Sequence, residues 1–553
     1  MAEIKGIVFD LDDTLYDCTE RLREAAHRRA AGAMVEAGLP LTVEEAYRLQ
    51  TDLMEEHGPR FKAFARIAEM YGRGNDFVDE VMRAYNRDEV EKIRPFPDVM
   101  PTLSQLRSMG LKLFLVTSGV YARQEKKIRL LGLKKCFDRI IINDDDRGVT
   151  KEECYINLME ESGLRAEELL SVGDRIHSEI RICNSLGMIT VHMMHGRFRD
   201  LVPSTESERA DFGIRAISEL PTVLQAVKLR GKKSSLKVVA IGGGTGLPIV
   251  LEGMKKYSRD LTAIVTVTDS GRSSGRLRRD LGVLPPGDIR NCLVALSESE
   301  KLLHNLFAYR FTAGALDGMN FGNLLIAALA KVTGSFEQAV REASSILAIR
   351  GKVFPSTLRD THICARLEDG TLVEEEYKVR EPGKPDIEQV FLKPPDAEAF
   401  DEAVDEILAS DLVVLGPGSL YTSTVCNLLI SGIAQAIRES PAKKVYVCNI
   451  VTQPGQTDGF DASKHVAVIE KYLGEGVLDY VIMNSTRPPA TMMKRYEQDG
   501  AELVRADEYS GRVESICRDV MEDVKDKRIL WEKQDLIRHN PDKLARVLVE
   551  TLS

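Results

Sequence analysis

Short apolar runs alternate with longer amphipathic stretches along most of the chain, and this alternation constrains the fold more than any other feature. The runs are apolar at nearly every position and rich in β-branched residues, which is typical of parallel strands buried on both faces. They span residues 6–9, 111–116, 139–142, 169–172, 190–192, 238–241, 263–267, 412–415, 445–449 and 480–483. The pattern predicts an α/β fold with two doubly wound, Rossmann-like parallel sheets, which bind ligands at the carboxyl ends of their strands.

A polar stretch at residues 229–235 divides the chain into two halves. It reads Leu-Arg-Gly-Lys-Lys-Ser-Ser, follows a predicted helix at 218–227 and precedes an apolar run. Such a sequence is typical of an inter-domain linker. We therefore place one domain at residues 1–231 and a second at residues 232–553, and we find no internal repeat between them.

Residues 17–95 interrupt the alternation. Apolar residues recur there at three- and four-residue spacing, which predicts helices at 21–37, 43–57, 61–71 and 77–85. The segment follows the first strand, so it would stand above the strand ends. We expect a helical cap that closes over an active site, with an ordinary helical subdomain as the alternative.

The composition excludes several classes of protein. The chain is 43% apolar and 29% charged, as in soluble globular proteins, and its net charge of −10 argues against a protein that coats nucleic acid or anionic membrane. No apolar run reaches the ~18 residues of a membrane span, and no basic-then-apolar leader opens the sequence. The nine cysteines form no Cys-x-x-Cys pair, which favours reduced thiols. We expect a cytoplasmic protein, and the sequence leaves open whether it is a homo-oligomer.

Two carboxylates lie close together at the end of the first predicted strand. Asp10 and Asp12 are two residues apart, so both can face one point. Converging carboxylates repel each other, and a divalent cation such as Mg²⁺, which prefers oxygen ligands, removes this cost. Asp10 can then attack phosphorus as a nucleophile. Asp12 can protonate the leaving oxygen and later activate water.

Further polar side chains follow at other strand ends and at a helix start. Thr117 and Ser118 end the second strand with two hydroxyls that suit phosphate oxygens. Lys151 opens a helix and can neutralise charge on the phosphate and the nucleophile. Asp174 follows the strand at 169–172 as a second metal ligand, and Glu179 can orient the metal's waters or Lys151.

These motifs, in this order, resemble the haloacid dehalogenase superfamily of phosphohydrolases over about residues 3–228. The resemblance implies a phosphatase for a small phosphorylated metabolite, with a phosphorylated Asp10 as intermediate and Asp12 as acid and base. It also implies phosphate contacts from Thr117 and Lys151, and Mg²⁺ held by Asp10, Asp174 and the carbonyl of Asp12. Asp12 favours phosphatase over dehalogenase chemistry, which does not need that acid.

Two positions depart from that family's pattern. Glu152 follows Lys151 where many relatives have proline, and Glu179 stands where aspartate is common. Neither change removes a charge that the mechanism needs.

A glycine loop follows the first strand of the second half. Glycine lets a backbone approach phosphate closely, and the helix that follows favours negative charge at its N-terminus. Leu247 occupies the last glycine position of the dinucleotide pattern, and no Gly-Lys-Ser/Thr is present, so the loop is neither that motif nor a Walker loop. The candidate phosphate-binding residues of this loop are Gly242, Gly243, Gly244, Thr245 and Gly246.

Other loops at predicted strand ends and helix starts add carboxylates, amides, hydroxyls and arginines, which pair with phosphate. Glycine and proline also simply make turns, which is the alternative explanation for any single loop. Several such loops at strand ends predict a site for a nucleotide or nucleotide sugar. The candidates are Asp269, Ser273, Ser274, Arg276, Asp288, Arg290, Asn291, Asn323, Gly416, Gly418, Ser419 and Asn449.

The pattern over about residues 236–490 resembles the gluconeogenesis factor family and its relatives, the 2-phospho-lactate transferases of deazaflavin cofactor synthesis. The gluconeogenesis factor branch is the more similar, notably over 445–458. That branch implies a UDP-sugar-binding regulator with no established turnover. The transferase branch implies phospholactyl transfer from a guanylyl diphosphate donor with Mg²⁺. Ser270 and Arg272 replace an aspartate and a glycine common in the first branch, which weakens a metal site and strengthens anion binding.

The last 60 residues are charged, and we expect them to be mostly helical from about residue 515, with helices at 519–527 and 540–552. Trp531 would anchor this tail. The whole sequence therefore predicts a bifunctional fusion of a Mg²⁺-dependent phosphatase with a nucleotide-sugar-binding regulatory domain. The alternatives for the second half are a transferase-like enzyme and a purely non-enzymatic sensor.

Overall fold

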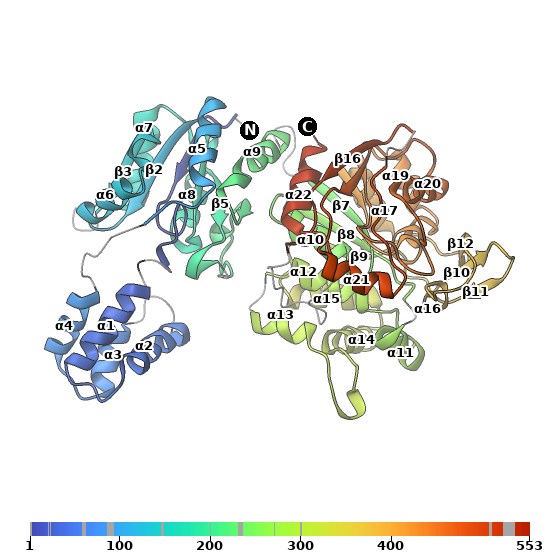
Figure 1. The fold of residues 1–553 in the computed structure, drawn as a ribbon, viewed down its shortest axis with the longest axis horizontal. Helices are drawn as coiled ribbons and strands as arrows, with labels where there is room; N and C mark the ends of the chain where they lie inside the picture. Colours follow the sequence, from blue (N-terminus) through green and yellow to red (C-terminus); the bar gives the residue numbers. More distant parts are fainter. Residues whose placement is uncertain are drawn as a thin grey trace. The chain divides into compact units, whose positions relative to one another are not determined.

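The computed structural model describes most of the chain, which divides into two compact units, Met1–Pro221 and Thr222–Ser553 (Figure 1). The division falls at the start of α9 (Leu220–Arg230). The linker was predicted at 229–235, but residues 229 and 230 still belong to α9, and residues 231–235 and Trp531 lie outside the described residues. The described residues are 3–19, 22, 24–57, 62–85, 93–144, 149–199, 201–230, 236–269, 271–298, 301–507, 511–523 and 537–552.

A six-stranded parallel sheet, in the order β3-β2-β1-β4-β5-β6, forms the centre of the first unit. All five strands predicted for this half are confirmed, and β6 is an addition. The order reverses at β1, which pairs with both β2 and β4, so the loops after β1 and β4 meet at the switch point. The strands are β1 (Gly6–Phe9), β2 (Lys112–Ser118), β3 (Arg139–Asn143), β4 (Leu169–Gly173), β5 (Ile189–Met193) and β6 (Phe212–Ile214).

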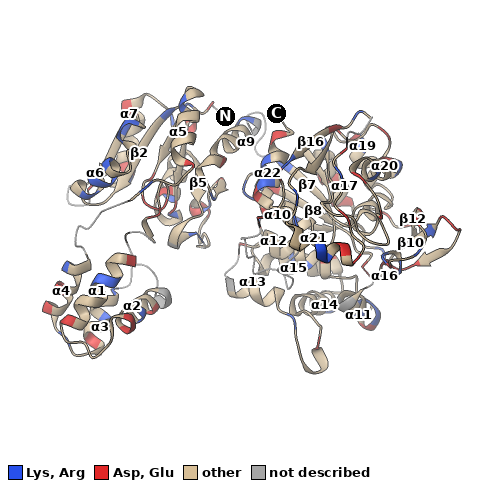
Figure 2. Ribbon diagram, in the orientation of Figure 1, with Lys and Arg blue, Asp and Glu red and all other residues tan. Residues whose placement is uncertain are grey.

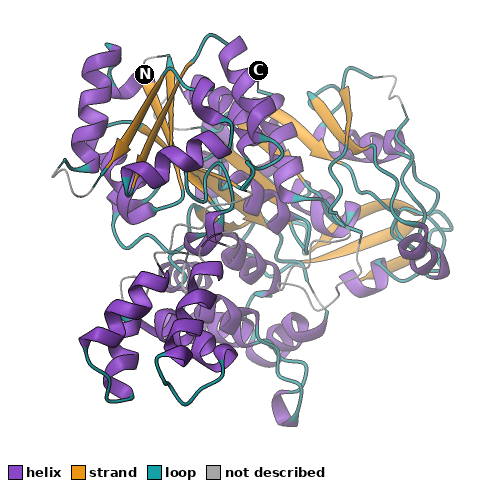
Figure 3. Cartoon of the chain, turned by 60° about the vertical axis from the view of Figure 1, so that its left-hand side comes forward, coloured by secondary structure: helices purple, strands orange, loops and turns teal. Residues whose placement is uncertain are grey.

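Helices complete the first unit, and Figure 3 shows them beside the strands. Buried side chains of the strands and of α7, such as Val8, Phe114 and Tyr155, form one apolar cluster. The helices that alternate with the strands are α5 (Val99–Ser108), α6 (Tyr121–Leu130), α7 (Lys151–Ser162), α8 (Arg181–Leu186) and α9.

The segment between β1 and α5 is helical, as predicted. Its helices pack around a core of their own that includes Met34, Ile67 and Phe77. They are α1 (Glu24–Glu36), α2 (Val43–His57), α3 (Ala63–Met70) and α4 (Asn75–Tyr85). The role of this segment as a cap stays a prediction.

A seven-stranded parallel sheet, in the order β16-β15-β14-β13-β7-β8-β9, forms the centre of the second unit. All five strands predicted for this half are confirmed. The order reverses at β7, where Ile241 pairs with Leu415 of β13, so the two glycine loops leave the sheet side by side. The strands are β7 (Lys237–Gly242), β8 (Asp260–Val265), β9 (Lys352–Pro355), β13 (Leu412–Leu415), β14 (Lys443–Val447), β15 (Tyr480–Asn484) and β16 (Glu514–Arg518).

Strand β16 corrects one prediction, because residues 514–518 pair with β15 instead of entering a helix. Its side chains are mostly exposed, so the run lacks the apolar signal of a buried strand. Residues 519–523 are not helical either, and 524–527 lie outside the described residues. The helix predicted at 540–552 is confirmed as α22 (Pro541–Glu550).

A small antiparallel sheet was not predicted. Its strands are β10 (His362–Leu367), β11 (Leu372–Glu374) and β12 (Ile387–Lys393), which pair in the order β11-β10-β12. In the sequence, α16 (Glu376–Val379) lies between β11 and β12. The other helices of the second unit are α10 (Leu247–Met254), α11 (Arg272–Leu281), α12 (Gly287–Leu296), α13 (Lys301–Ala308), α14 (Phe321–Thr333), α15 (Phe336–Ile346), α17 (Asp401–Ala409), α18 (Cys426–Leu428), α19 (Ile433–Glu439), α20 (Ala462–Leu473) and α21 (Ala490–Gln498).

Lys and Arg are interspersed with Asp and Glu over the helices of both units in the view of Figure 2. Among the described residues, no helix combines the length and the apolar character that crossing a membrane requires.

Helix α22 packs directly on α10. A Cβ at Gly253 of α10 would overlap the carbonyl of Pro541, and the buried Lys256 ammonium pairs with Asp542. The close approach requires glycine. Helix α10, which follows the first glycine loop, is therefore held against α22, which lies near the end of the chain.

Replacing Gly253 with Val is expected to destabilise the second unit by about 1–3 kcal/mol, because the new side chain overlaps backbone that cannot rotate away. Thermal unfolding of the full chain would measure this. Gly32→Ala on α1 is the control, since a Cβ there meets nothing within 4 Å. An unchanged melting temperature for Gly253→Val would contradict the contact.

Candidate functional site

The switch point of the first sheet gathers buried acidic side chains. Asp10 directly follows β1 and Asp174 directly follows β4, and the backbone N–H of Asp10 donates to the carbonyl of Val172 at 2.9 Å. Asp10 and Asp174 are 4% and 1% exposed. Thr117, near the end of the neighbouring β2, is also buried. The parallel register therefore places three of the predicted residues at one edge of the sheet.

Lys151 joins this group from the first turn of α7. Thr150 and Glu153 form a capping box that fixes the start of the helix. The ammonium of Lys151 lies 2.9 Å from Asp10 Oδ1 and also contacts Glu179. Burial raises the pKa of Asp10 to about 6, although Lys151 opposes this rise. Burial alone would lower the pKa of Lys151, but the two carboxylates outweigh it and raise the pKa.

The chemistry of this group fits Mg²⁺. Burial raises the pKa of Asp174 well above its ordinary value, and Glu179 and Asp10 raise it further. Asp174 Oδ1 and Glu179 Oε2 are buried and have no hydrogen-bond partner among the described residues. Buried carboxylate oxygens without donors need a cation, and hard oxygen ligands suit Mg²⁺.

Asp12 is held by side chains that the sequence did not point to. Its carboxylate lies 2.8 and 2.9 Å from the ammonium of Lys127, accepts a hydrogen bond from the Tyr16 hydroxyl at 2.5 Å and one from Gln124 Nε2 at 3.3 Å. Burial raises the pKa of Asp12, but Lys127 and these hydrogen bonds lower it by more. Asp12 is therefore ionised in this arrangement.

Gln124 also connects Asp12 to the end of β2. Its Nε2 donates to Thr117 Oγ1 at 3.1 Å and to the Ser118 carbonyl at 2.7 Å. Gln124 and Lys127 are three residues apart on α6 and both are buried. Nothing in the sequence indicates this role, because α6 is rich in charged residues and only the structure shows that these two side chains are buried.

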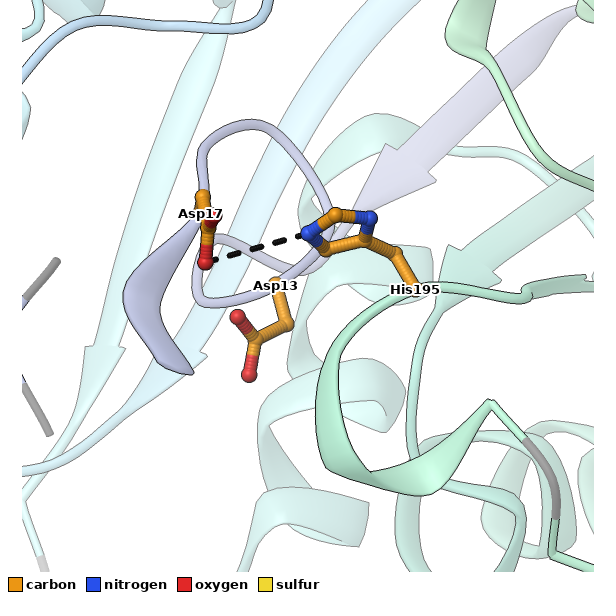
Figure 4. Close-up of side chains that lie close together, drawn as sticks. All are labelled: Asp13, Asp17 and His195. Carbon is orange, nitrogen blue, oxygen red and sulfur yellow. Dashed lines mark ion pairs between the residues drawn. The ribbon is translucent and has the colours of Figure 1, made fainter. Parts of the chain in front are cut away.

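A second cluster in this unit consists of Asp13, Asp17 and His195 (Figure 4). Their ligand atoms lie within 4.8 Å of one another, and His195 Nε2 is 3.8 Å from Asp17 Oδ1. The carboxylate of Asp13 already accepts hydrogen bonds from the backbone N–H groups of Cys18 and Thr19 at 2.9 and 2.8 Å. These bonds satisfy backbone N–H groups where the chain leads into the helical insert, so Asp13 has a structural role.

In the second unit, the two glycine loops border a cavity of about 870 Å³. Gly246 packs so closely on Pro417 that a Cβ would overlap its carbonyl. Most of the residues predicted for this half line the cavity: Gly244, Thr245, Gly246, Asp269, Ser274, Asp288, Arg290, Asn291, Asn323, Gly418, Ser419 and Asn449.

The other predicted residues do not line it. Arg276 is exposed and lies 3.6 Å from Asp280. Gly243 is needed for space, since a Cβ would overlap Thr266 and Asp288, and Gly416 has a φ of +75°. Gly242 ends β7. The side chain of Ser273 lies outside the described residues.

Three carboxylates meet the cavity near the first glycine loop. Asp288 accepts a hydrogen bond from the Gly244 N–H at 2.6 Å, and Asp269 accepts one from Gly271 at 2.8 Å. Glu376 comes from α16 and pairs with Arg380 at 3.2 Å. Burial, and then the charge of Asp269, raise the pKa of Asp288 to about 6 and that of Glu376 to about 8. The proton that Glu376 holds at neutral pH makes this wall less negative.

Another part of the lining comes from loops after β13 and β14 and from the end of the chain. Ser419 donates to Gln453 Oε1 at 2.7 Å and accepts from Gln456 Nε2 at 2.9 Å. The sequence did not point to several other lining residues, because they come from the loop after α13, the antiparallel insert, the region of α21 and the tail. They are Arg310, Glu376, Tyr377, Arg380, Tyr496, Asp499, Arg538 and His539.

Two family models match the chain, one in each unit. The model for haloacid dehalogenase-like hydrolases matches residues 4–187, which include the cluster around Asp10. The model for 2-phospho-L-lactate transferase CofD matches residues 238–524, which include both glycine loops.

Relatives with known names cover the second unit. The gluconeogenesis factor of Halalkalibacterium halodurans is 43% identical over 314 residues, which are 57% of this chain and 95% of that protein. The gluconeogenesis factor of Bacillus subtilis is 42% identical over 317 residues, 57% of this chain and 98% of that protein. The chain belongs to the gluconeogenesis factor family.

A solved structure agrees with this assignment. The crystal structure of a UPF0052 family protein from Bacillus halodurans has a TM-score of 0.53 and 41% identity, and the match covers 57% of this chain and 98% of that one. Both resemblances found in the sequence are confirmed. The chain joins a haloacid dehalogenase-like hydrolase region to a gluconeogenesis factor region.

Proposed function

We propose that the first unit is a Mg²⁺-dependent phosphatase for a small phosphorylated metabolite. The buried group of Asp10, Lys151, Glu179 and Asp174 at the switch point carries this proposal. Asp10 is the nucleophile, and Lys151 and Thr117 bind phosphate oxygens. Asp10, Asp174 and the carbonyl of Asp12 would hold Mg²⁺. When bound, the ion neutralises the charge of the phosphoryl group.

The reaction proceeds in two steps at one phosphorus atom. An Asp10 carboxylate oxygen forms a bond to phosphorus while the bond to the leaving oxygen breaks, and Asp12 gives that oxygen a proton. Water then attacks the phosphorus and gives a proton to Asp12, which releases phosphate and restores Asp10. In the second step Asp12 must be ionised in order to accept a proton, and its ion pair with Lys127 favours this ionised form. The first step requires Asp12 to separate from Lys127 and take up a proton.

Phosphate release by the full chain from a panel of phosphomonoesters tests this proposal. We expect release with Mg²⁺ and none after chelation with EDTA, restored by added Mg²⁺. Release that is insensitive to EDTA, or no release from any phosphomonoester, would contradict it.

For the second unit we propose a regulatory domain that binds a UDP-sugar. A cavity of about 870 Å³ falls in the ~300–1,000 Å³ range of small-molecule sites, and its glycine loops and arginines suit a diphosphate. Asp269 and Asp288 favour a second candidate, a transferase-like enzyme that uses a nucleoside diphosphate donor. Both candidates place the phosphates beside the glycine loops.

A thermal-shift experiment on the full chain separates the two candidates. A ligand at 100 times its Kd stabilises the folded state by about 2.7 kcal/mol. A shift with UDP-N-acetylglucosamine and none with GDP supports the regulator, and the reverse supports the transferase. No shift with either ligand contradicts both. We also propose that this ligand alters the phosphatase, so an unchanged phosphatase rate and KM in its presence would remove the coupling.

The protonation of Glu376 predicts how binding depends on pH. Below about pH 8 the carboxyl holds a proton, and above it a negative charge enters the cavity and repels a diphosphate. Ligand affinity should therefore fall as the pH rises from about 7 to 9. Glu376→Gln should bind roughly three- to tenfold more tightly than the wild type at about pH 9, and equally at about pH 6.5.

Titration calorimetry with UDP-N-acetylglucosamine at both pH values measures the effect. Glu374→Gln is the control, because this nearby carboxylate is 49% exposed and pairs with Lys393 outside the cavity lining. Equal pH dependence in the wild type and in Glu376→Gln would show that Glu376 does not face the ligand.

A further inference from the structure

A histidine in the cavity lining, near the end of the chain, carries a buried acceptor without a partner among the described residues. His539 is 5% exposed and lines the cavity just before α22. Its ring bonds to the backbone carbonyl of Cys448, while Nε2 has no partner among the described residues. A nitrogen bonded to a carbonyl must carry the proton, so the neutral ring has its lone pair on Nε2. Burial, which lowers the pKa of His539 to about 4, keeps the ring neutral.

A glutamine in the cavity lining presents a second acceptor of the same kind. Gln456 is also 5% exposed, and its Nε2 donates to Ser419 Oγ at 2.9 Å and to Gln453 Oε1 at 3.4 Å. Its Oε1 is buried without a partner among the described residues. The bonds made by Nε2 fix the orientation of the amide, so the free atom is the acceptor oxygen.

Two buried acceptors without partners, both on residues that line the cavity, match a ligand group that donates hydrogen bonds. Leaving such a group unsatisfied costs about 1–3 kcal/mol, so native structures seldom do so without a reason. A fully ionised phosphate has only acceptor oxygens and cannot meet this need. The phosphates belong beside the glycine loops and arginines. The complement of His539 and Gln456 is an N–H or O–H group on the neutral part of the same ligand.

We infer that His539 and Gln456 are specificity-determining residues that accept hydrogen bonds from the base or sugar of a nucleoside diphosphate ligand, an inference that rests on the binding function proposed above. The glycine loops would hold any diphosphate. The two acceptors would select a ligand whose other end carries a donor, because a ligand without one leaves both atoms unpaired.

Titration calorimetry on the full chain tests the inference with UDP-N-acetylglucosamine, UDP and inorganic pyrophosphate as probes. His539→Phe removes the acceptor and keeps a ring. We expect its affinity for UDP-N-acetylglucosamine to fall roughly 10- to 100-fold, with affinity for pyrophosphate unchanged. His539→Gln, which keeps an acceptor, should recover part of the loss.

The chain offers a matched control in His465. This histidine is fully buried, its Nδ1 bonds to the Asp461 carbonyl at 2.8 Å and its Nε2 is also unpartnered, but it does not line the cavity. His465→Phe should leave all three affinities unchanged. If His539→Phe does not fold, Gln456→Met carries the same test, with the same expected loss.

The probes also locate the donor. Equal losses for UDP and UDP-N-acetylglucosamine place it on the uridine, and a loss for UDP-N-acetylglucosamine alone places it on the sugar. Wild-type affinity in both His539→Phe and Gln456→Met, or an equal loss for pyrophosphate, overturns the inference but leaves the proposed binding function standing. A wild-type chain that binds neither of the two uridine ligands overturns both.

Discussion

Replacing Asp10 with Asn is expected to abolish phosphate release while the first unit stays folded. The amide cannot act as the nucleophile, and loss of a nucleophile costs about four orders of magnitude or more in rate. The fold should survive because Asp10 is one of three buried carboxylates that repel one another. After the substitution, Lys151 still pairs with Glu179.

Phosphate release with Mg²⁺ and circular dichroism of the same samples measure the two parts of this result. Asp17→Asn is the control, since Asp17 lies in the same loop but faces His195 (Figure 4). It should keep most of the activity. Wild-type rates in Asp10→Asn would remove Asp10 as the nucleophile, and a complete loss in Asp17→Asn alone would move the chemistry to the cluster of Figure 4.

Replacing Lys151 with Met is expected to destabilise the first unit by about 3–5 kcal/mol and to stop phosphate release. The substitution leaves Asp10 and Glu179 buried without their cation, and an uncompensated buried charge costs about this much. Lys5→Met is the matched control. It also removes one lysine from an ion pair, with Glu168, but Lys5 is 55% exposed, so about 1 kcal/mol or less should be lost.

Adding Glu179→Gln to Lys151→Met should restore a large part of the stability but none of the activity, because the double variant removes one unpaired charge and no catalytic function returns. Urea denaturation followed by circular dichroism reports both units. An equal loss of stability in Lys151→Met and Lys5→Met would contradict the buried ion pair.

The sequence predicted most strands of the two parallel sheets, because their central positions are apolar and polar stretches flank them. It did not predict β6, β16 or β9, although three of the four residues of β9 are buried. Strand β6 has only three residues, and β16 exposes most of its side chains and reads as a charged segment. The antiparallel strands β10 and β12 were missed as well, so the segment that brings Glu376 to the cavity had no predicted place in the fold.

The same distinction applies to the site residues. Asp10, Thr117 and Asp174 stand at strand ends, so the parallel topology alone brings them together. Lys127 stands in a run of charged residues, and only tertiary structure shows that it is buried against Asp12, 115 residues away in the sequence. His539 likewise lies in a tail that the sequence predicted only as mostly helical, and its partner carbonyl, that of Cys448, directly follows β14.

The packing of α22 on α10 has a consequence for protein synthesis. Every residue of the first unit has been translated before β7, so this unit can fold while the ribosome is still making the second. The cavity lacks His539 and the support of α22 until residues 537–550 have been added. A premature stop codon in that stretch should therefore yield a chain whose hydrolase unit is intact but which no longer responds to the ligand of the other unit.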